Sequence, residues 1–277
     1  MPARAASGFG NWDFSWVQNE VPKPYSPGTE ARAKLRVAVD ELYAREDEVP
    51  CVIGGKDVFT GNTADDVMPT EHAHKICTYH IGGEAEIKAA IDASMSTDAK
   101  DWATWPFEDR AAVFLRAADL CADKYREELN ASIMLDTGKT AREADIDNTE
   151  ISDFYRFGVA NAAEIYSMQP PSLYKAQNYW NRMEHRALEG FVAAIAPFNF
   201  CALGANLLGM PALMGNSVVF KPSSTAMHES YFIMKILKEA GLPDGVVNFV
   251  PCGGSTFGNA VLPHKDAARR LRRRVVG

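Results

Sequence analysis

Polar side chains follow two apolar runs in the second half of the chain. The run Gly190–Ile195 leads into Ala-Pro-Phe-Asn at 196–199, and the run Val218–Phe220 leads into Lys221. The amide of Asn199 is a neutral hydrogen-bond donor, which suits the oxyanion that develops at an attacked carbonyl. The ammonium group of Lys221 can donate to ribose hydroxyls or to a phosphate. Together these two groups predict a nucleotide-cofactor site.

A third such end follows the run Val246–Val250. There Gly254 and Gly258 would let the backbone and a helix N-terminus approach a pyrophosphate. The sequence has no G-x-G-x-x-G, so the ordinary dinucleotide fingerprint is absent. From the residues alone, Asn199 is at least as well explained as a structural amide in a turn, and Lys221 as a solvated strand end.

The elements that would position these residues alternate between strand and helix. The pattern predicts strands at 190–196, 217–220 and 246–250, and helices at 201–214, at 225–240 and from 254 onward. Such alternation implies right-handed crossovers and a parallel sheet, in which ligands bind outside the carboxyl ends of the strands. We therefore expect the three polar ends to lie along one edge of an α/β sheet.

The first 170 residues have a different pattern. Helical spacing occurs over 29–45, 82–94 and 109–130, and it continues over 131–166 with a break at Gly138. Two short β-rich runs around Gly54 and Gly55 predict a hairpin, and residues 174–188 alternate as an extended segment. We place a boundary near Pro170 and Pro171.

Composition limits the class of protein. The chain has 277 residues, 47% of them hydrophobic and 23% charged, as in a soluble globular protein. Its net charge is −7, and the segment 263–277 holds six basic residues against one acidic residue, so the body is more acidic still. This excludes nucleic acid as the expected partner. The uncharged stretch 190–220 is interrupted by proline, glycine and asparagine, so we expect no membrane span.

Cysteine and histidine offer alternative chemistry. The five cysteines are widely spaced without C-x-x-C, which predicts reduced thiols in an intracellular protein. We expect Cys201 and Cys252 to pack as small core residues rather than act as nucleophiles. The motif H-x-H-x2-C-x2-H at 72–80 has the composition of a zinc site but not the spacing of a finger, so we expect no metal.

Four motifs in register resemble the aldehyde dehydrogenase superfamily. They are Glu189-Gly-Phe-Val-Ala-Ala-Ile-Ala-Pro-Phe-Asn-Phe200, Pro211-Ala-Leu-Met-Gly-Asn216, Phe220-Lys-Pro-Ser223 and Glu239-Ala-Gly-Leu-Pro243. Over residues 50–258, including Phe154-Tyr-Arg-Phe157, the chain resembles the L-glutamate γ-semialdehyde (1-pyrroline-5-carboxylate) dehydrogenases within it. The resemblance implies NAD-dependent oxidation of that small aldehyde to L-glutamate in proline catabolism, by a homo-oligomer.

The resemblance also implies roles for individual residues. Asn199 would be the catalytic oxyanion donor, while Glu150 and Phe200 would bind the amino group and the chain of the substrate. The cofactor-binding residues would be Ala196, Pro197, Phe198, Lys221, Pro222, Ser223, Gly254 and Gly258. It further implies the mitochondrial matrix as location in a eukaryote, and the cytoplasm otherwise.

The end of the sequence departs from the family pattern. The nucleophilic cysteine and the general-base glutamate of the family have no counterpart here, and a thiohemiacetal route needs both. We therefore expect this polypeptide to be inactive by itself. The alternatives are that it is another aldehyde dehydrogenase, that it is a non-catalytic fragment that binds a nucleotide or a partner, or that it does not fold alone.

The interpretation divides the chain into four parts. These are an N-terminal helical region with a small hairpin (1–172), part of an oligomerisation hairpin (173–189), a partial NAD-binding domain with an incomplete Rossmann-like parallel sheet (190–262), and a basic tail outside the family (263–277).

Overall fold

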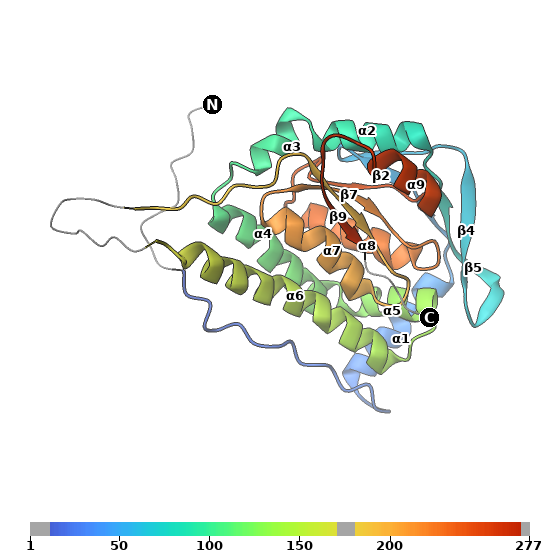
Figure 1. The fold of residues 1–277 in the computed structure, drawn as a ribbon. Helices are drawn as coiled ribbons and strands as arrows, with labels where there is room; N and C mark the ends of the chain where they lie inside the picture. Colours follow the sequence, from blue (N-terminus) through green and yellow to red (C-terminus); the bar gives the residue numbers. More distant parts are fainter. Residues whose placement is uncertain (1–11, 171–180, 273–277) are drawn as a thin grey trace.

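The structure, a computed structural model, describes residues 12–170 and 181–272 (Figure 1). The helices are α1 (Glu30–Tyr43), α2 (Glu84–Ser94), α3 (Thr97–Trp102), α4 (Phe107–Asp119), the π-helical turn η1 (Leu120–Lys124), α5 (Arg126–Thr137), α6 (Ala141–Ser167), α7 (Cys201–Leu213), α8 (Met227–Glu239) and α9 (Gly254–Val261). The strands are β1 (Asp47–Val49), β2 (Cys51–Ile53), β3 (Lys56–Val58), β4 (Thr63–Met68), β5 (Glu71–His80), β6 (Phe191–Ile195), β7 (Ser217–Lys221), β8 (Val247–Phe249) and β9 (Ala267–Arg272).

The main sheet has six strands in the order β3-β2-β8-β7-β6-β9. The strands β8, β7, β6 and β9 run parallel, as the alternation of strand and helix predicts. Helices cover both faces (Figure 1). Phe191 and Ala193 of β6 pack toward α2 and α9, whereas Val192 and Ala194 pack toward the helices on the other face. Burial on both faces explains why this strand is apolar at every position.

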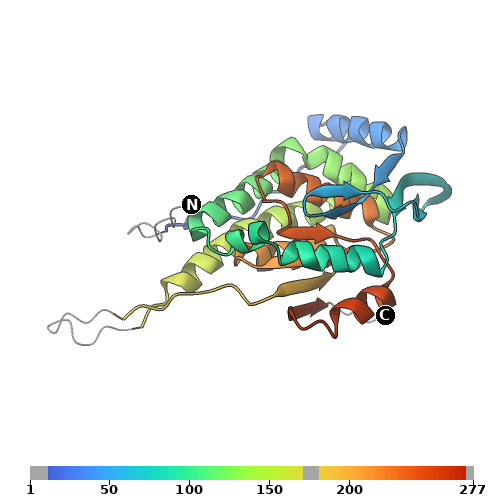
Figure 2. The ribbon, with the colours of Figure 1, turned by 90° about the horizontal axis from the view of Figure 1, so that it is seen from above.

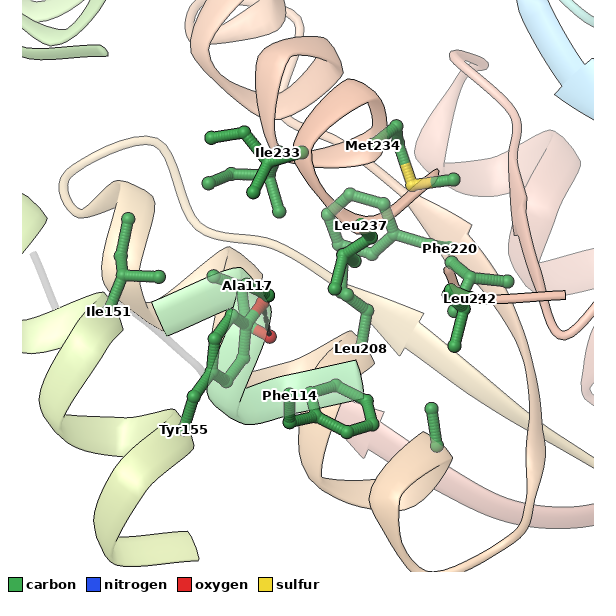
Figure 3. Close-up of a cluster of buried hydrophobic side chains, with 14 of the residues drawn as sticks. Phe114, Ala117, Ile151, Tyr155, Leu208, Phe220, Ile233, Met234, Leu237 and Leu242 are labelled. Carbon is green, nitrogen blue, oxygen red and sulfur yellow. Dashed lines mark hydrogen bonds between the residues drawn. The ribbon is translucent and has the colours of Figure 1, made fainter. Parts of the chain in front are cut away.

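The larger core lies between the sheet and the helices α4, α6, α7 and α8. Figure 3 shows Tyr155 of α6 beside Phe114 of α4, with Leu208 of α7 and Leu237 of α8 nearby. The rings of Phe114 and Tyr155 meet edge to face at 5.3 Å, and the Tyr155 hydroxyl donates to a backbone carbonyl of α7. A tyrosine can be fully buried here because its polar end is satisfied.

The N-terminal hairpin belongs to the main sheet rather than to a separate region. β2 and β3 pair antiparallel, as predicted, and β2 then pairs antiparallel with β8 through Val52 and Phe249. The side-chain oxygen of Asn248 also accepts the N–H of Gly54 at 2.7 Å. The hairpin thus covers one edge of the parallel strands, and Figure 2 shows it across the sheet from β9.

The opposite edge carries a strand that the sequence analysis placed outside the sheet. Residues 267–272, within the segment assigned as a basic tail, form β9 and pair with all five residues of β6. Pairing uses the peptide groups of β6, which any extended backbone can satisfy whatever its side chains. The expected boundary at residue 262 therefore falls inside the sheet.

Two further differences concern the first half of the chain. A second sheet, in the order β1-β5-β4, was not predicted, because the segments of β4 and β5 are largely polar and lack a buried apolar alternation. The helix expected over 109–130 is interrupted by η1, where the N–H of Tyr125 bonds to the carbonyl of Leu120 at 2.8 Å. The predicted break at Gly138 is present, with φ of +70°.

The segment expected as an oligomerisation hairpin is described only in part. Residues 181–189 form no strand, and the remainder of the expected hairpin over 171–180 lies outside the described residues. Within the described ranges, no helix combines the length and the apolar character that a membrane crossing requires.

Candidate functional site

The carboxyl ends of β6, β7 and β8 meet at one edge of the sheet. Ile195 lies opposite Lys221 in the parallel register, and the N–H of Ala196 donates to the carbonyl of Lys221 at 3.0 Å. The N–H of Val250, at the end of β8, donates to the carbonyl of Phe220 at 2.9 Å. The strand ends therefore bring the three polar segments of the sequence side by side, as expected for a ligand site in a parallel sheet.

Asn199 lies in the short loop between β6 and α7. Its side-chain oxygen is buried and has no hydrogen-bond partner within the described residues. An unpaired buried polar atom costs on the order of 1–3 kcal/mol, so such an atom in a loop at this edge is consistent with a ligand contact. Because the two ends of an amide exchange by a half-turn, the position can present either an acceptor or a donor.

Two aromatic rings flank Asn199. Phe198 is 53% exposed and Phe200 is 37% exposed, although both lie next to well-buried segments of β6 and α7. Pro197 and Ala196 precede them, and Ala196 is buried. Uncovered aromatic side chains beside a partly buried polar amide form the kind of surface that binds a planar or apolar ligand.

Lys221 is half-buried at the end of β7. Its Nζ donates to the carbonyl of Pro222 at 2.7 Å, which leaves two N–H groups for a ligand. Burial lowers the pKa of the Lys221 ammonium group, and the nearby Cys252 thiol has a smaller opposite effect. Ser223 follows with its hydroxyl 3.3 Å from that of Thr225. The hydrogen bond to Pro222 thus holds the ammonium group close to the end of β7.

The start of α9 completes this edge. Gly253 occupies the N-cap position without a side-chain cap, and Gly253 and Gly254 are exposed. A Cβ built at Gly254 would meet no atom within 4 Å, and one at Gly258 would only touch Leu262 at 3.8 Å. Protein packing does not require either glycine. The open space at Gly254 leaves the helix N-terminus accessible to an anion.

The two expected substrate residues are Glu150 in α6 and Phe200 at the start of α7. The ammonium group of Lys139, which the sequence analysis did not single out, acts on both. Nζ of Lys139 lies 4.5 Å from the centre of the Phe200 ring and 2.6 Å from Asp147. Burial raises the pKa of the Glu150 carboxyl, the charge of Asp147 adds to this, and Lys139 opposes it. The same two charges, Lys139 and Asp147, therefore act on Glu150 and lie next to Phe200.

Asp147 is the second functional candidate that sequence analysis missed. It is fully buried, and its two oxygens accept the N–H groups of Cys201 at 3.0 Å and Ala202 at 2.9 Å. A possible signal was its spacing of three residues from Glu150 on a predicted helix, which places both on one face. Its partner, however, lies more than 50 residues away, so the contact itself has no local pattern.

The cysteines and histidines are arranged as structural residues. Cys201 is 3% exposed, and burial raises its thiol pKa well above the ordinary value. Burial likewise raises the pKa of Cys252 to about 11. On β5, His74 stacks on Tyr43 and His80 bonds to Glu48 at 2.8 Å. Across the described residues, no three His, Cys, Asp or Glu side chains are grouped to hold a metal ion.

Comparison with known proteins gives a consistent result. The model of the aldehyde dehydrogenase family matches residues 59–269. A Delta-1-pyrroline-5-carboxylate dehydrogenase of Agaricus bisporus is 46% identical over 248 residues, which cover 88% of this chain and 45% of the relative. The mitochondrial enzyme of that name from Mus musculus is 43% identical over 88% of this chain and 43% of its own length.

Solved structures agree with the sequence comparison. The Delta-pyrroline-5-carboxylate dehydrogenase of Mycobacterium tuberculosis superposes with a TM-score of 0.88 at 39% identity, covering 98% of this chain and 48% of that chain. A structure of the same enzyme bound with NAD gives a TM-score of 0.86. The chain spans about half the length of the relatives that it matches. By motif, fold and similarity, this chain belongs to the aldehyde dehydrogenase family.

Proposed function

We propose that this chain provides the cofactor-binding and oxyanion-binding half of a dehydrogenase that uses NAD to oxidise L-glutamate γ-semialdehyde to L-glutamate. The observation that carries the proposal is the meeting of three groups at one sheet edge. These are the Asn199 amide with its buried, unpaired side-chain oxygen, the ammonium group of Lys221 and the open N-terminus of α9. Relatives that match most of this chain are named for that activity, and a similar structure is bound with NAD.

The residues fit a dinucleotide by their chemistry. Lys221 offers two N–H groups to a ribose, and the uncapped start of α9 can face the adenosine and pyrophosphate groups. Ala196, Pro197 and Phe198 would line the nicotinamide side, with Pro222 and Ser223 beside the ribose. When bound, NAD would accept the hydride removed from the substrate.

On the substrate side, the chain would orient the aldehyde and stabilise charge. The Asn199 amide would donate to the oxygen of the attacked carbonyl. Glu150 would bind the amino group of the substrate, and Phe200 would pack against its carbon chain. The small aldehyde is the proposed partner, together with further copies of the chain in a homo-oligomer. By analogy with the relatives named as mitochondrial, we propose the mitochondrial matrix as the location if the protein comes from a eukaryote, and the cytoplasm otherwise.

The nucleophile is the group that this chain does not supply from its own cysteines. Four of the five are buried, and burial raises the pKa of the fifth, Cys252, to about 11, so the reactive thiolate is disfavoured at each position. This observation favours a second candidate function for the chain alone, namely nucleotide binding without catalysis.

The test is calorimetric titration of the chain with NAD, comparing Lys221→Met with Lys235→Met as a matched control. Lys235 is an exposed lysine of α8 whose ammonium group lies over the Tyr231 ring. Loss of a hydrogen bond from a charged group costs about 1.5–3 kcal/mol, so Lys221→Met should weaken NAD binding about tenfold or more. Equal affinity of the two variants would refute the assignment of Lys221.

Absorbance at 340 nm then separates binding from turnover. With L-glutamate γ-semialdehyde and NAD, the chain alone should produce no NADH, while still binding NAD. NADH production at enzymatic rates would show that one of its five cysteines serves as the nucleophile after all.

A further inference from the structure

The start of α7 is capped from another helix. Phe200 occupies the N-cap position and offers no side-chain hydrogen bond to the first turn. Asp147 of α6 takes that place, accepting the N–H groups of Cys201 and Ala202 with its two oxygens. These are the first two residues of the helix. A carboxylate at a helix N-terminus satisfies otherwise unpaired donors and interacts favourably with the helix dipole.

The same cap connects the two proposed substrate contacts. Asn199 lies two residues before Cys201, so a fixed start of α7 restricts the backbone of Asn199. Glu150 lies one turn after Asp147 on α6. Lys139 pairs with Asp147 and contacts the Phe200 ring, which adds a third connection between α6 and the loop.

The two helices are also packed too closely to slide. A Cβ built at Gly209 of α7 would come within 2.6 Å of Cε1 of Tyr155 on α6, a distance that real Cβ contacts do not show. The Tyr155 hydroxyl in turn donates to the carbonyl of Ala205 at 3.3 Å. α6 and α7 therefore behave as one rigid unit at this contact.

We propose that Asp147 is a positioning residue, which fixes the Asn199 amide relative to the Glu150 carboxylate by holding the first two N–H groups of α7. Lys139 assists by balancing the buried charge of Asp147 and by holding Phe200. The functional meaning of this arrangement rests on the proposed function, because it assigns Asn199 to the oxyanion and Glu150 to the substrate amine. The cap would thus fix the distance between the group that binds the substrate's carbonyl oxygen, Asn199, and the group that binds its amine, Glu150.

The first experiment does not depend on any ligand. Amide hydrogen exchange of the full chain is measured for wild type, Asp147→Asn and Glu164→Gln, the last being an exposed carboxylate on the same helix. Asparagine can accept from only one of the two N–H groups and turns its own N–H2 toward the other. We expect exchange across residues 197–203 to rise about tenfold in Asp147→Asn. Exchange in β7 and in the Glu164→Gln protein should stay at the wild-type rate.

Equal exchange in Asp147→Asn and wild type would overturn the proposal, as would a uniform rise over the whole chain, which indicates general destabilisation. If Asp147→Asn does not fold, Lys139→Gln serves instead, because it leaves both cap hydrogen bonds in place. It should raise exchange across residues 197–203 about threefold and nowhere else. Wild-type exchange at that segment in Lys139→Gln would then count against the proposal.

A second experiment separates positioning from a merely structural role. NAD and AMP are titrated into wild type and Asp147→Asn, since AMP lacks the nicotinamide that the Asn199 loop would contact. Asp147→Asn should weaken NAD binding about threefold to tenfold and leave AMP binding unchanged. An equal loss for both ligands would favour a structural role. If wild type binds neither ligand, the proposed function fails, while the exchange experiment still decides the role of Asp147.

Discussion

The buried carboxyl of Glu229 makes a testable contribution to stability. Glu229 lies in the first turn of α8, is 1% exposed, and its Oε2 has no hydrogen-bond partner among the described residues. Asp136, which is 3% exposed, accepts the Glu229 N–H at 2.7 Å, and Asp66 accepts the N–H of Met227 at 2.8 Å. Three carboxyl groups are thus enclosed around one helix start.

Burial is the main cause of the pKa changes in this cluster. It raises the pKa of Glu229 well above its ordinary value, and the charge of Asp136 adds to the effect. It also raises the pKa of Asp136 well above its ordinary value, where the charge of Asp66 adds and the N–H of Glu229 opposes. Burial also raises the pKa of Asp66 to about 6, against the hydrogen bonds from backbone N–H groups. Through these three groups, the folded state binds more protons than the unfolded chain above about pH 4. Their contribution to stability falls as the pH rises from there until each folded-state pKa is passed.

The substitution Glu229→Gln keeps the shape of the side chain and removes its titration. A carboxyl that stays neutral in the fold costs about 1.4 kcal/mol of stability for every pH unit above its unfolded pKa. Relative to wild type, the variant should therefore gain stability as the pH rises from 5 toward the folded-state pKa of Glu229, at no more than about 1.4 kcal/mol per pH unit. The gain comes from the unfolded state of wild type, which is ionised over this range.

Urea unfolding followed by tryptophan fluorescence at pH 5, 6 and 7 and constant ionic strength measures this gain. Histidines and distant carboxyls titrate in both proteins, so the difference between the two curves reports Glu229 together with its effect on Asp136 and Asp66. Glu164→Gln, on the exposed side of α6, is the control and should give a constant difference. A constant difference for Glu229→Gln as well would show that Glu229 is ionised in the fold, and would refute this reasoning.

Three further predictions test other contacts. Asp145→Asn should reduce the free energy of unfolding by about 3–5 kcal/mol, measured by urea denaturation, because both oxygens of this buried carboxylate pair with Arg126 at 2.8 and 2.9 Å. Gly138→Ala should cost about 1 kcal/mol or more, visible as a lower Tm, because φ is +70° and the added Cβ would lie 3.2 Å from Cγ of Pro69. Iodoacetamide at pH 8 should modify Cys252 slowly and the four buried cysteines only after unfolding; rapid labelling of Cys201, detected by mass spectrometry, would contradict its assignment to the core.

The alternation of elements after residue 190 could be predicted because strand and helix differ there in local pattern. β6 and β7 are short, apolar at nearly every position and bounded by proline or glycine, which together specify strands buried on both faces. The break at Gly138 was equally local, since glycine readily adopts a positive φ. The position of Asn199 and Lys221 at neighbouring strand ends followed from the parallel topology.

The remaining features depend on contacts between distant residues. Nothing near Asp147 indicates that its carboxylate caps a helix beginning at Cys201. In the same way, the largely polar segments of β4 and β5 show no apolar residue at every second position. They form strands because their backbones pair with each other, which no local pattern reveals. The strand β9 escaped prediction for the same reason: the free edge of β6 determined its structure more than its own composition did.

The joining of β2 to β8 has a consequence for synthesis in the cell. Gly54 and its partner Asn248 are 194 positions apart, and an isolated two-stranded hairpin is at best marginally stable in water. At about 5–20 residues per second, the ribosome would deliver Asn248 roughly 10–40 seconds after Gly54. During that interval the nascent hairpin has no sheet to join, and the apolar side chains Cys51 and Val52 stay uncovered. The hairpin can therefore reach its place at the edge of the sheet only after β8 has been synthesised.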